Sequence, residues 1–171
     1  MARDTMSGLI DRVQRLIDDE AGDLFSDDVI EEHLDRHRDR VVYAELVAEP
    51  TYATGGTVSY LAFCHSLGWG DWEVADLVAQ DYASVTADTA DLKTGRWTFS
   101  SEPDYPLYIT GWSYDIYGAA AELLDMLMVR LGANCDNCDY YRKMATQYRT
   151  QTRQRGGVVS VEMVRGDVAV Y

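Results

Sequence analysis

Four segments of the chain repeat apolar residues every three or four positions, which is the period of one face of an α-helix. They cover about residues 7–20, 27–39, 113–131 and 139–153. The third has the widest apolar face, from Ile116 to Leu131, and Gly132 follows at the position where glycine commonly ends a helix. In the second, Asp28 and Glu31 have the spacing of a capping box. The pattern therefore predicts four helices.

The segment between the second and third helices, about residues 40–110, has the two-residue period of β-strands. Glycine and proline interrupt it at Pro50 and at the turns 54–57, 68–71 and 93–95. The runs between these interruptions are short, as strands usually are. We therefore expect a β-rich insertion in the middle of the chain.

Two glycines, Gly156 and Gly157, separate the last predicted helix from a valine-rich segment, residues 157–171. Valine favours β-strands, and a two-stranded hairpin alone is only marginally stable in water. We expect a β hairpin or an extended arm that docks on a neighbour or on its own β-rich middle. The sequence thus predicts an α+β fold: a mainly helical bundle of about four helices with a β-rich insertion in the middle, which together form one domain over residues 1–156, followed by a C-terminal β hairpin or arm.

The chain is strongly acidic, with 29 acidic residues, 15 basic ones and a formal net charge of −14. Such a surface repels phosphate groups, which argues against general, sequence-independent affinity for nucleic acid. Twenty of the acidic residues are aspartate, and only two lysines accompany 13 arginines. We expect a protein adapted to concentrated salt, from a halophilic archaeal host, although arginine in place of lysine also follows from a GC-rich genome. No run of about 18 apolar residues occurs, so we expect no membrane span.

Candidate metal ligands are few. His33 and His37 lie four residues apart on one predicted helix, and Cys135 and Cys138 form a C-x-x-C pair. These are ligand types of a tetrahedral zinc site, but they lie on separate elements, and packed or solvated side chains are the simpler interpretation. With Cys64, the cysteines number three in a chain that lacks a signal-peptide pattern. We therefore expect free thiols rather than a disulfide framework.

Motifs of catalysis do not occur in the sequence, which has no phosphate-binding loop, no GxSxG and no HExxH. The paired carboxylates at 18–19 and 27–28 have no candidate nucleophile beside them and are typical of helix ends. We therefore expect a protein that is not an enzyme and that uses no cofactor.

Aromatic residues with a polar group predominate, with four tryptophans and 12 tyrosines against 3 phenylalanines. Tryptophan, tyrosine and arginine are typical of surfaces that bind other proteins. For the tryptophans near predicted turns, subunit contact and local packing are equally good interpretations. The interface candidates are Trp69, Trp72, Trp112, Arg142, Arg149, Arg153, Val159, Val161, Val168 and Tyr171.

Several stretches, taken in order, resemble one protein family. The sequence reads Gly95-Arg96-Trp97-Thr98-Phe99, then Gly111-Trp112-Ser113-Tyr114-Asp115-Ile116-Tyr117-Gly118-Ala119-Ala120-Ala121, then Met144-Ala145-Thr146-Gln147-Tyr148. Over about residues 7–155, this arrangement resembles the head–tail connector (adaptor) proteins of long-tailed phages and related archaeal viruses or proviruses. The β-rich middle is longer than in the compact all-helical members, and the residues after 157 lie outside the resemblance.

The resemblance implies a structural virion protein of the neck, at the head–tail junction, that assembles in the host cytoplasm. Its copies would form a homo-oligomeric ring, a dodecamer, beneath the portal protein. The ring would extend the DNA channel without sequence-specific DNA binding and would dock the next neck or tail protein. Two alternatives stay open: a tail-terminator or stopper neck protein, and a zinc-binding regulator or enzyme that uses His33, His37, Cys135 and Cys138.

Overall fold

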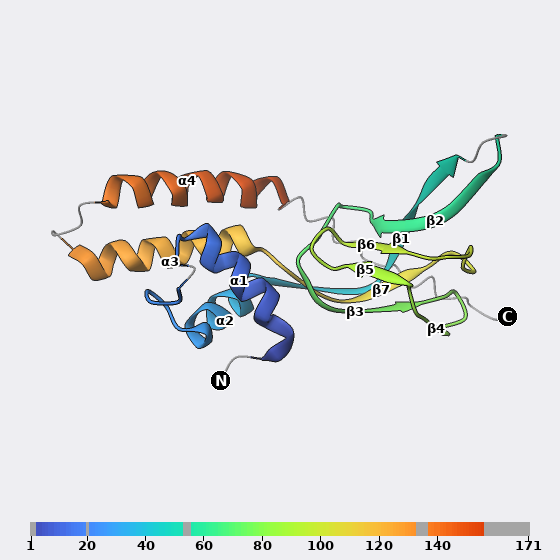
Figure 1. Cartoon of the computed structure of the whole chain (residues 1–171), viewed down its shortest axis with the longest axis horizontal. Helices are drawn as coiled ribbons and strands as arrows, with labels where there is room; N and C mark the ends of the chain where they lie inside the picture. The colour runs from blue at the N-terminus through green and yellow to red at the C-terminus, as the bar shows by residue number, and fades with distance from the viewer. Residues whose placement is uncertain (1–2, 20, 53–55, 133–136, 156–171) are drawn as a thin grey trace, which may run out of the picture.

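The computed structural model describes residues 3–19, 21–52, 56–132 and 137–155. Two lobes lie end to end along the long axis of the molecule (Figure 1). One lobe consists of helices, and the other is a curled antiparallel sheet. The helices come from both ends of the described chain, whereas the strands come from its middle.

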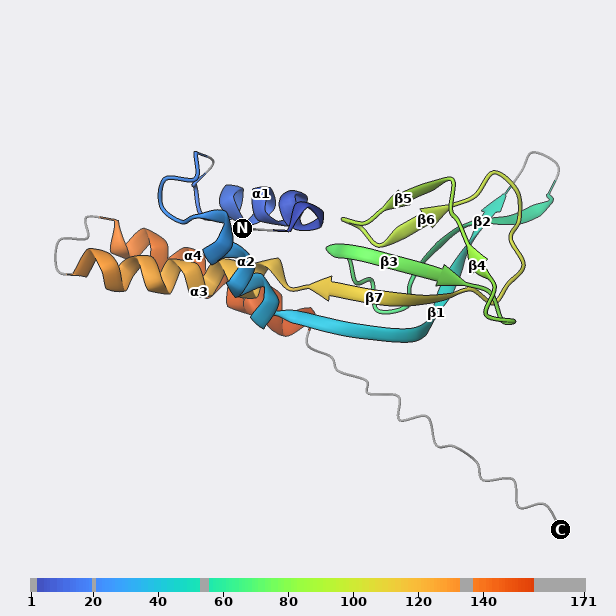
Figure 2. The ribbon, with the colours of Figure 1, turned by 90° about the horizontal axis from the view of Figure 1, so that it is seen from below.

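The helical lobe is organised around α3, which contacts each of the other three α-helices. Its elements are the short 3-10 helix η1 (Asp4–Met6) and the α-helices α1 (Ser7–Leu16), α2 (Asp27–Arg36), α3 (Ile116–Leu131) and α4 (Cys138–Arg155). α4 runs back along α3, and α1 and α2 lie on the other side of α3 (Figures 1 and 2). α3 begins where the Asp115 carboxylate accepts the backbone N–H groups of Tyr117 and Gly118, which is the usual chemistry of a helix N-terminus.

The β lobe is one seven-stranded sheet in which every pairing is antiparallel. Its strands are β1 (Arg38–Tyr52), β2 (Val58–His65), β3 (Trp72–Val78), β4 (Ser84–Val85), β5 (Thr89–Asp91), β6 (Arg96–Thr98) and β7 (Tyr108–Tyr114). The strand order is β4-β3-β7-β1-β2-β6-β5. The two outermost strands, β4 and β5, have only two and three residues.

The longest strand, β1, belongs to both halves of the sheet. Residues 38–45 pair with β7, and residues 46–52 pair with β2. The register shifts between Val41 and Ala44, where Tyr43 has a φ of 53°, and again between residues 49 and 50. Because such bulges bend a strand and increase its twist, the sheet curls along β1.

Each lobe has its own hydrophobic core. The helical core contains Leu9, Ile10, Val13, Ile17, Phe25, Ile30, Leu34, Tyr114, Ile116, Leu123, Leu124 and Leu127. The core of the β lobe contains Val41, Leu46, Phe63, Trp72, Leu77, Trp97, Phe99, Leu107 and Ile109. Tyr114 ends β7 and packs in the helical core, so the chain passes from one core to the other without an intervening linker.

Polar contacts join the two lobes. Arg12 of α1 forms an ion pair with Asp71, which lies immediately before β3 and has a side-chain exposure of 0%. Glu73 of β3 accepts hydrogen bonds from the hydroxyl groups of Tyr114 and Thr5, both at 2.6 Å. Since a buried charge needs its partner, these contacts fix the β lobe against the N-terminal helices.

Two turns of the β lobe pack backbone against backbone beside this junction. A Cβ atom at Gly70 would lie 2.0 Å from the carbonyl oxygen of Lys93, and one at Gly95 would lie 2.0 Å from that of Trp69. The indole N–H of Trp72 donates to the same Trp69 oxygen at 2.9 Å. Only glycine leaves room for this approach at both positions.

The predicted mainly helical bundle is wrong. Among the described residues, helix and strand have similar shares, 38% and 32%, and the strands form a seven-stranded sheet with a core of its own. The alternating pattern indicated short strands, but it does not contain the pairing of Arg38 with Tyr114, two residues far apart in the sequence. That pairing turns the middle of the chain into a second lobe rather than an insertion on a bundle.

Four α-helices are present near the predicted ranges, but the first two end earlier than expected. α1 ends at Leu16 because the chain turns at Asp19, whose carboxylate accepts two backbone N–H groups of the following loop. α2 ends at Arg36 because Arg38 already pairs with Tyr114 in the sheet. The C-terminal arm predicted over residues 157–171 lies outside the described residues.

Candidate functional site

The two histidines of α2 contact a carboxylate of α3. His33 Nδ1 lies 3.0 Å from Glu122 Oε2 with hydrogen-bond geometry. His37 Nε2 lies 3.1 Å from Glu122 Oε1, an ion-pair distance without hydrogen-bond geometry. His33 is buried, and Glu122 is partly exposed. The histidine pair singled out in the sequence therefore contacts Glu122.

Close packing of α2 on α3 depends on small residues beside this cluster. Residues 118–121 of α3, one glycine and three alanines, are all buried. A Cβ atom at Gly118 would lie 2.6 Å from Nδ1 of His37, so only glycine lets this imidazole approach the helix. Glu122 follows directly on α3 and is placed within reach of both histidines.

The pKa of Glu122 lies below its ordinary value. Burial acts to raise this pKa, but the hydrogen bond with His33 and the electrostatic interactions with His33 and His37 together outweigh burial. The carboxylate therefore favours its ionised form in the folded protein. A lowered folded-state pKa contributes stability above the ordinary glutamate pKa, and that contribution is lost as the pH falls through the folded-state pKa.

Glu122→Gln should destabilise the protein at pH 5.5 by up to about 1 kcal/mol, as expected for a partly exposed ion pair. The difference between variant and wild type should shrink as the pH falls below about 4, where the wild-type carboxylate also becomes neutral. Urea denaturation at several pH values measures both effects. Glu32→Gln, which removes an exposed pair with Arg36 on α2, is the matched control and should show a smaller pH dependence. An unchanged difference at pH 3 would contradict the assignment.

The expectation of free thiols is confirmed for Cys64 and wrong for Cys138. Cys138 is disulfide-bonded, whereas Cys64 is free, half-buried and has a pKa raised by burial and by nearby Glu49. A sulfur in a disulfide lacks the thiolate that binds zinc. Cys135 lies outside the described residues. Within the described part of the chain, no group of three or more histidine, cysteine or carboxylate side chains is arranged to hold a metal ion.

The three tryptophan candidates have different surroundings. Trp72 has 2% exposure and lies in the core of the β lobe, so its side chain is not on a surface where a neighbouring subunit binds. Trp69 is partly buried and stacks on His65 with ring centroids 5.1 Å apart. Trp112 is partly buried on β7, and the guanidinium groups of Arg38 and Arg40 lie 4.4 and 5.7 Å from its ring. Trp72 is therefore a core residue, whereas Trp69 and Trp112 are partly exposed and stay interface candidates.

The arginine candidates of α4 are exposed. Arg142 pairs with Asp139 of the same helix at 2.7 Å, and Arg149 pairs with Asp125 of α3. These pairs are solvent-exposed and contribute little to stability, which leaves both side chains accessible to a partner. The side chain of Arg153 and the candidates Val159, Val161, Val168 and Tyr171 lie outside the described residues.

Exposed apolar side chains occur where α3 ends and α4 begins. This is the far end of the helical lobe (Figure 1). Val129 is 81% exposed, and Leu131 and Tyr140 are 42% and 50% exposed. We call these three residues the helical tip. The apolar pattern predicted Leu131 as the end of the core face of this helix, and its exposure depends on where the neighbouring helices end, which a local pattern does not contain.

A second group of exposed apolar side chains lies at the opposite end of the molecule. The hairpin of β1 and β2 extends beyond the rest of the sheet (Figure 1). Tyr52 is 74% exposed, and Val58, which pairs with it at the end of the hairpin, is also exposed. The ring of Tyr60 on β2 lies 6.2 Å from the ring of the exposed Tyr105, measured between their centroids. We call these four residues the β tip.

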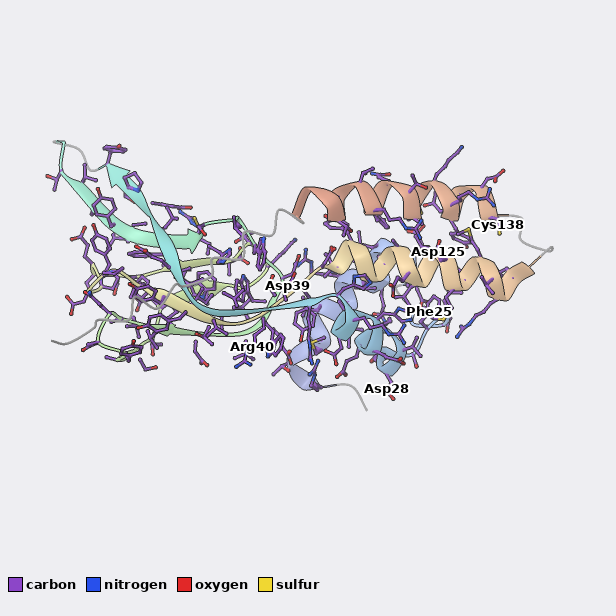
Figure 3. All side chains as sticks on the ribbon, turned by 180° about the vertical axis from the view of Figure 1, so that it is seen from behind. Phe25, Asp28, Asp39, Arg40, Asp125 and Cys138 are labelled. Carbon is purple, nitrogen blue, oxygen red and sulfur yellow. The ribbon has the colours of Figure 1, made fainter. Side chains whose placement is uncertain are left out.

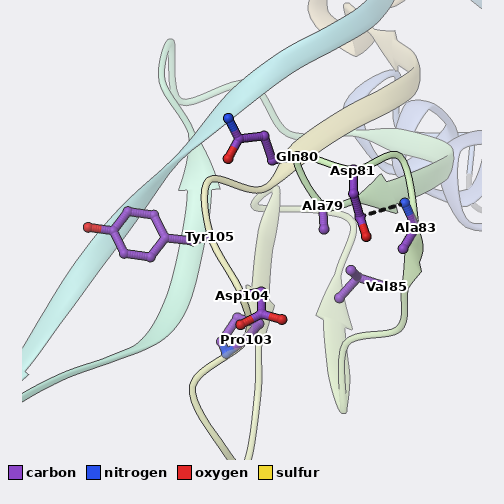
Figure 4. Close-up of a pocket in the computed structure, with 8 residues that line it drawn as sticks. All are labelled: Ala79, Gln80, Asp81, Ala83, Val85, Pro103, Asp104 and Tyr105. Carbon is purple, nitrogen blue, oxygen red and sulfur yellow. Dashed lines mark hydrogen bonds between the residues drawn. The ribbon is translucent and has the colours of Figure 1, made fainter.

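An open pocket of about 340 Å³ lies on the β lobe near β4 (Figure 4). Asp81, Asp104 and Tyr105 are among its lining residues, and Asp81 accepts a hydrogen bond from the backbone of Ala83. The lining contains two carboxylates and no basic side chain, which disfavours anionic ligands. It brings together no nucleophile and base of a known catalytic arrangement.

Comparison with known protein families, curated proteins and solved structures gives no match. In the described part of the chain, no helix combines the length and apolar character needed to cross a membrane. The resemblance to head–tail connectors therefore stays a prediction, and the two tips are the surfaces that a functional hypothesis has to explain.

Proposed function

We propose that the chain is a structural subunit of a tailed-virus neck: a head–tail connector that assembles into a ring beneath the portal and docks the next neck or tail protein. The proposal rests on the sequence resemblance over about residues 7–155. The observation that best supports it is the position of exposed apolar side chains at both ends of an elongated subunit.

A neck subunit must bind one partner on the head side and another on the tail side. The helical tip and the β tip differ in composition, since the first is mainly aliphatic and the second is rich in tyrosine. Contiguous exposed apolar residues commonly mark protein interaction sites, and tyrosine is enriched there. Two chemically different ends fit two different partners along the axis of a ring.

The net charge of −14 supports the same proposal. DNA binds proteins mainly through contacts between basic side chains and phosphates. A ring of strongly acidic subunits would provide few such contacts, so DNA could pass through its channel without adhering. This is the behaviour that a conduit for DNA requires.

A second candidate is another neck protein, either a stopper or a tail terminator. Both of these classes are β-rich. The seven-stranded sheet is the observation that favours it. The two candidates differ in their partner, because a connector binds the portal directly, whereas a tail terminator binds the end of the tail tube.

The test of the proposal combines the purified protein with the portal protein encoded in the same genome. We expect ring-shaped assemblies on the portal by electron microscopy, and the protein in purified virions. The variant Val129→Asp with Leu131→Asp should lose one axial contact without unfolding, since both positions are exposed. A protein that stays monomeric with its portal and is absent from virions would refute the proposal, and binding to tail tubes alone would favour the tail terminator.

The acidic surface also predicts a dependence on salt. The melting temperature should rise between 0.1 M and 2 M potassium chloride, because the Debye length falls from about 10 Å to about 3 Å or less and self-repulsion is screened. For a chain of this size, each gain of about 1 kcal/mol raises the melting temperature by about 2–4 °C. Thermal unfolding followed by circular dichroism measures the change, and a flat profile would remove the halophilic expectation.

A further inference from the structure

One edge of the sheet has backbone groups without a partner strand. Residues 38–45 of β1 pair with β7 on one side only, because β2 pairs with β1 from residue 46 onwards. In Figure 2 this half of β1 runs along the outer margin of the sheet, and Figure 3 shows Asp39 and Arg40 on it beside the helical lobe. Among the described residues, no other strand lies on its outer side.

In an antiparallel pair, every second residue of a strand bonds to its partner, and the residues between them point their N–H and C=O groups the other way. This alternation identifies the outward-facing residues of the edge. Asp115 N–H donates to the carbonyl of His37 at 2.8 Å, so the residues that bond to β7 along this run are Asp39 and Val41. The N–H and C=O groups of Arg38 and Arg40 therefore point away from the sheet. Unpaired groups of this kind are a template for another strand.

Several other outer positions of the sheet are short or interrupted. β4 and β5 are too short to receive a strand of ordinary length. The second half of β1 contains Pro50 next to a bulge, and proline cannot donate to an added strand. The run Arg38–Val42 has no proline, and Val42 is 60% exposed. It is a continuous stretch of edge that can accept a strand.

We propose that residues 158–162 of a second copy of the chain add to this edge as an antiparallel strand. Valine occupies three of these five positions, which gives the segment a high strand propensity. With Ser160 opposite Arg40, Val158 lies opposite the exposed Val42, and Glu162 lies opposite Arg38. These cross-strand pairs are apolar with apolar and acidic with basic, both of which stabilise antiparallel sheets.

The direction of α4 is the reason that the strand comes from a second copy. α4 runs from the far end of the helical lobe towards the junction, and β1 runs from the junction into the β lobe (Figures 1 and 2). All pairings of the sheet are antiparallel, and antiparallel addition of the segment to its own β1 would require the chain to reverse its direction within Gly156 and Gly157. A neighbouring copy can present the segment in the opposite direction.

This contact extends the proposed function. It rests on that proposal, because the ring supplies the neighbouring copies. An accepting edge and a donated segment are two different surfaces of one subunit, and such head-to-tail contacts close into rings when the rotation between copies allows it. The tips would then bind axial partners, and the edge would bind the next subunit.

Cysteine cross-linking between two full-length variants tests the inference. Arg40→Cys and Ser160→Cys copies with different tags are mixed under assembly conditions and oxidised. Facing residues of an antiparallel pair have Cα atoms about 5.5 Å apart, which a disulfide can span. We expect a mixed disulfide-linked dimer, several-fold more abundant than with the control pair Thr89→Cys and Ser160→Cys, in which the acceptor position lies on the short strand β5.

A second pair, Val42→Cys with Val158→Cys, tests the same register if Arg40→Cys fails to fold by circular dichroism. Absence of the mixed dimer with both pairs would overturn the inference. A disulfide that forms within single chains carrying both cysteines, independently of concentration, would also overturn it, because the segment would then fold back on its own subunit. Rings that form on the portal without the cross-link would leave the connector proposal intact while refuting strand exchange.

Discussion

Asp71→Asn should destabilise the protein by about 3–5 kcal/mol, the usual effect of removing one partner from a buried ion pair. Asp71 is completely buried against Arg12 of α1, so the variant leaves the guanidinium group facing a neutral amide between the lobes. Asparagine tolerates the positive φ of 60° at this position, so the loss reports on charge rather than on the backbone. Chemical denaturation measures the change.

The control is Asp76→Asn, an exposed aspartate on β3 that should change stability by less than about 0.5 kcal/mol. The double variant Arg12→Met with Asp71→Asn should be less destabilised than the sum of the single variants, because no unpaired charge remains. Strictly additive effects would show that the two side chains do not act as a pair.

Gly95→Ala should destabilise the protein by about 2–5 kcal/mol, the sum of two effects. A left-handed alanine costs about 1–2 kcal/mol, and Gly95 has a φ of +67°. The new methyl group would also lie 2.0 Å from the Trp69 carbonyl oxygen, so the two turns would have to separate, at a further cost of about 1–3 kcal/mol or more.

Gly68→Ala separates the two effects. Gly68 has nearly the same φ, +66°, but no atom lies within 4 Å of its Cβ position. This variant should therefore lose only the conformational part, about 1–2 kcal/mol. Thermal or urea unfolding of both variants gives the comparison, and equal losses would show that the contact between the two turns contributes nothing.

The helices were more predictable from the sequence than the architecture. The period of α3 and the glycine that follows it are local features, and a local pattern suffices to place a helix. The sheet depends on pairings between distant residues, such as Arg38 with Tyr114 and Leu46 with His65. Alternation of side chains indicates that a strand exists, but it does not say which strand lies beside it. Because the strand pairings could not be predicted, the strands were expected to form only an insertion on a mainly helical bundle.

The candidate residues show the same limit. His33 and His37 were visible as an i, i+4 pair, but their partner Glu122 lies on another helix far along the chain. A signal for it existed, since Glu122 is a carboxylate within a run of small and apolar residues of α3. Asp71 was read only as a turn residue, because burial of its charge depends on Arg12 of α1. Contacts between distant segments again decide what a residue does.

The chain enters and leaves the β lobe at the same place on the helical lobe. The backbone N–H of Asp115 donates to the carbonyl of His37 at 2.8 Å, so the two ends of residues 38–114 are hydrogen-bonded neighbours. A module attached in this way can be gained or lost in evolution by joining α2 directly to α3 through a short connection. The packing of the four helices would change mainly at Tyr114, whose side chain belongs to the helical core. Arg12 would then lose its buried partner, and an uncharged residue at that position would mark relatives that lack the module.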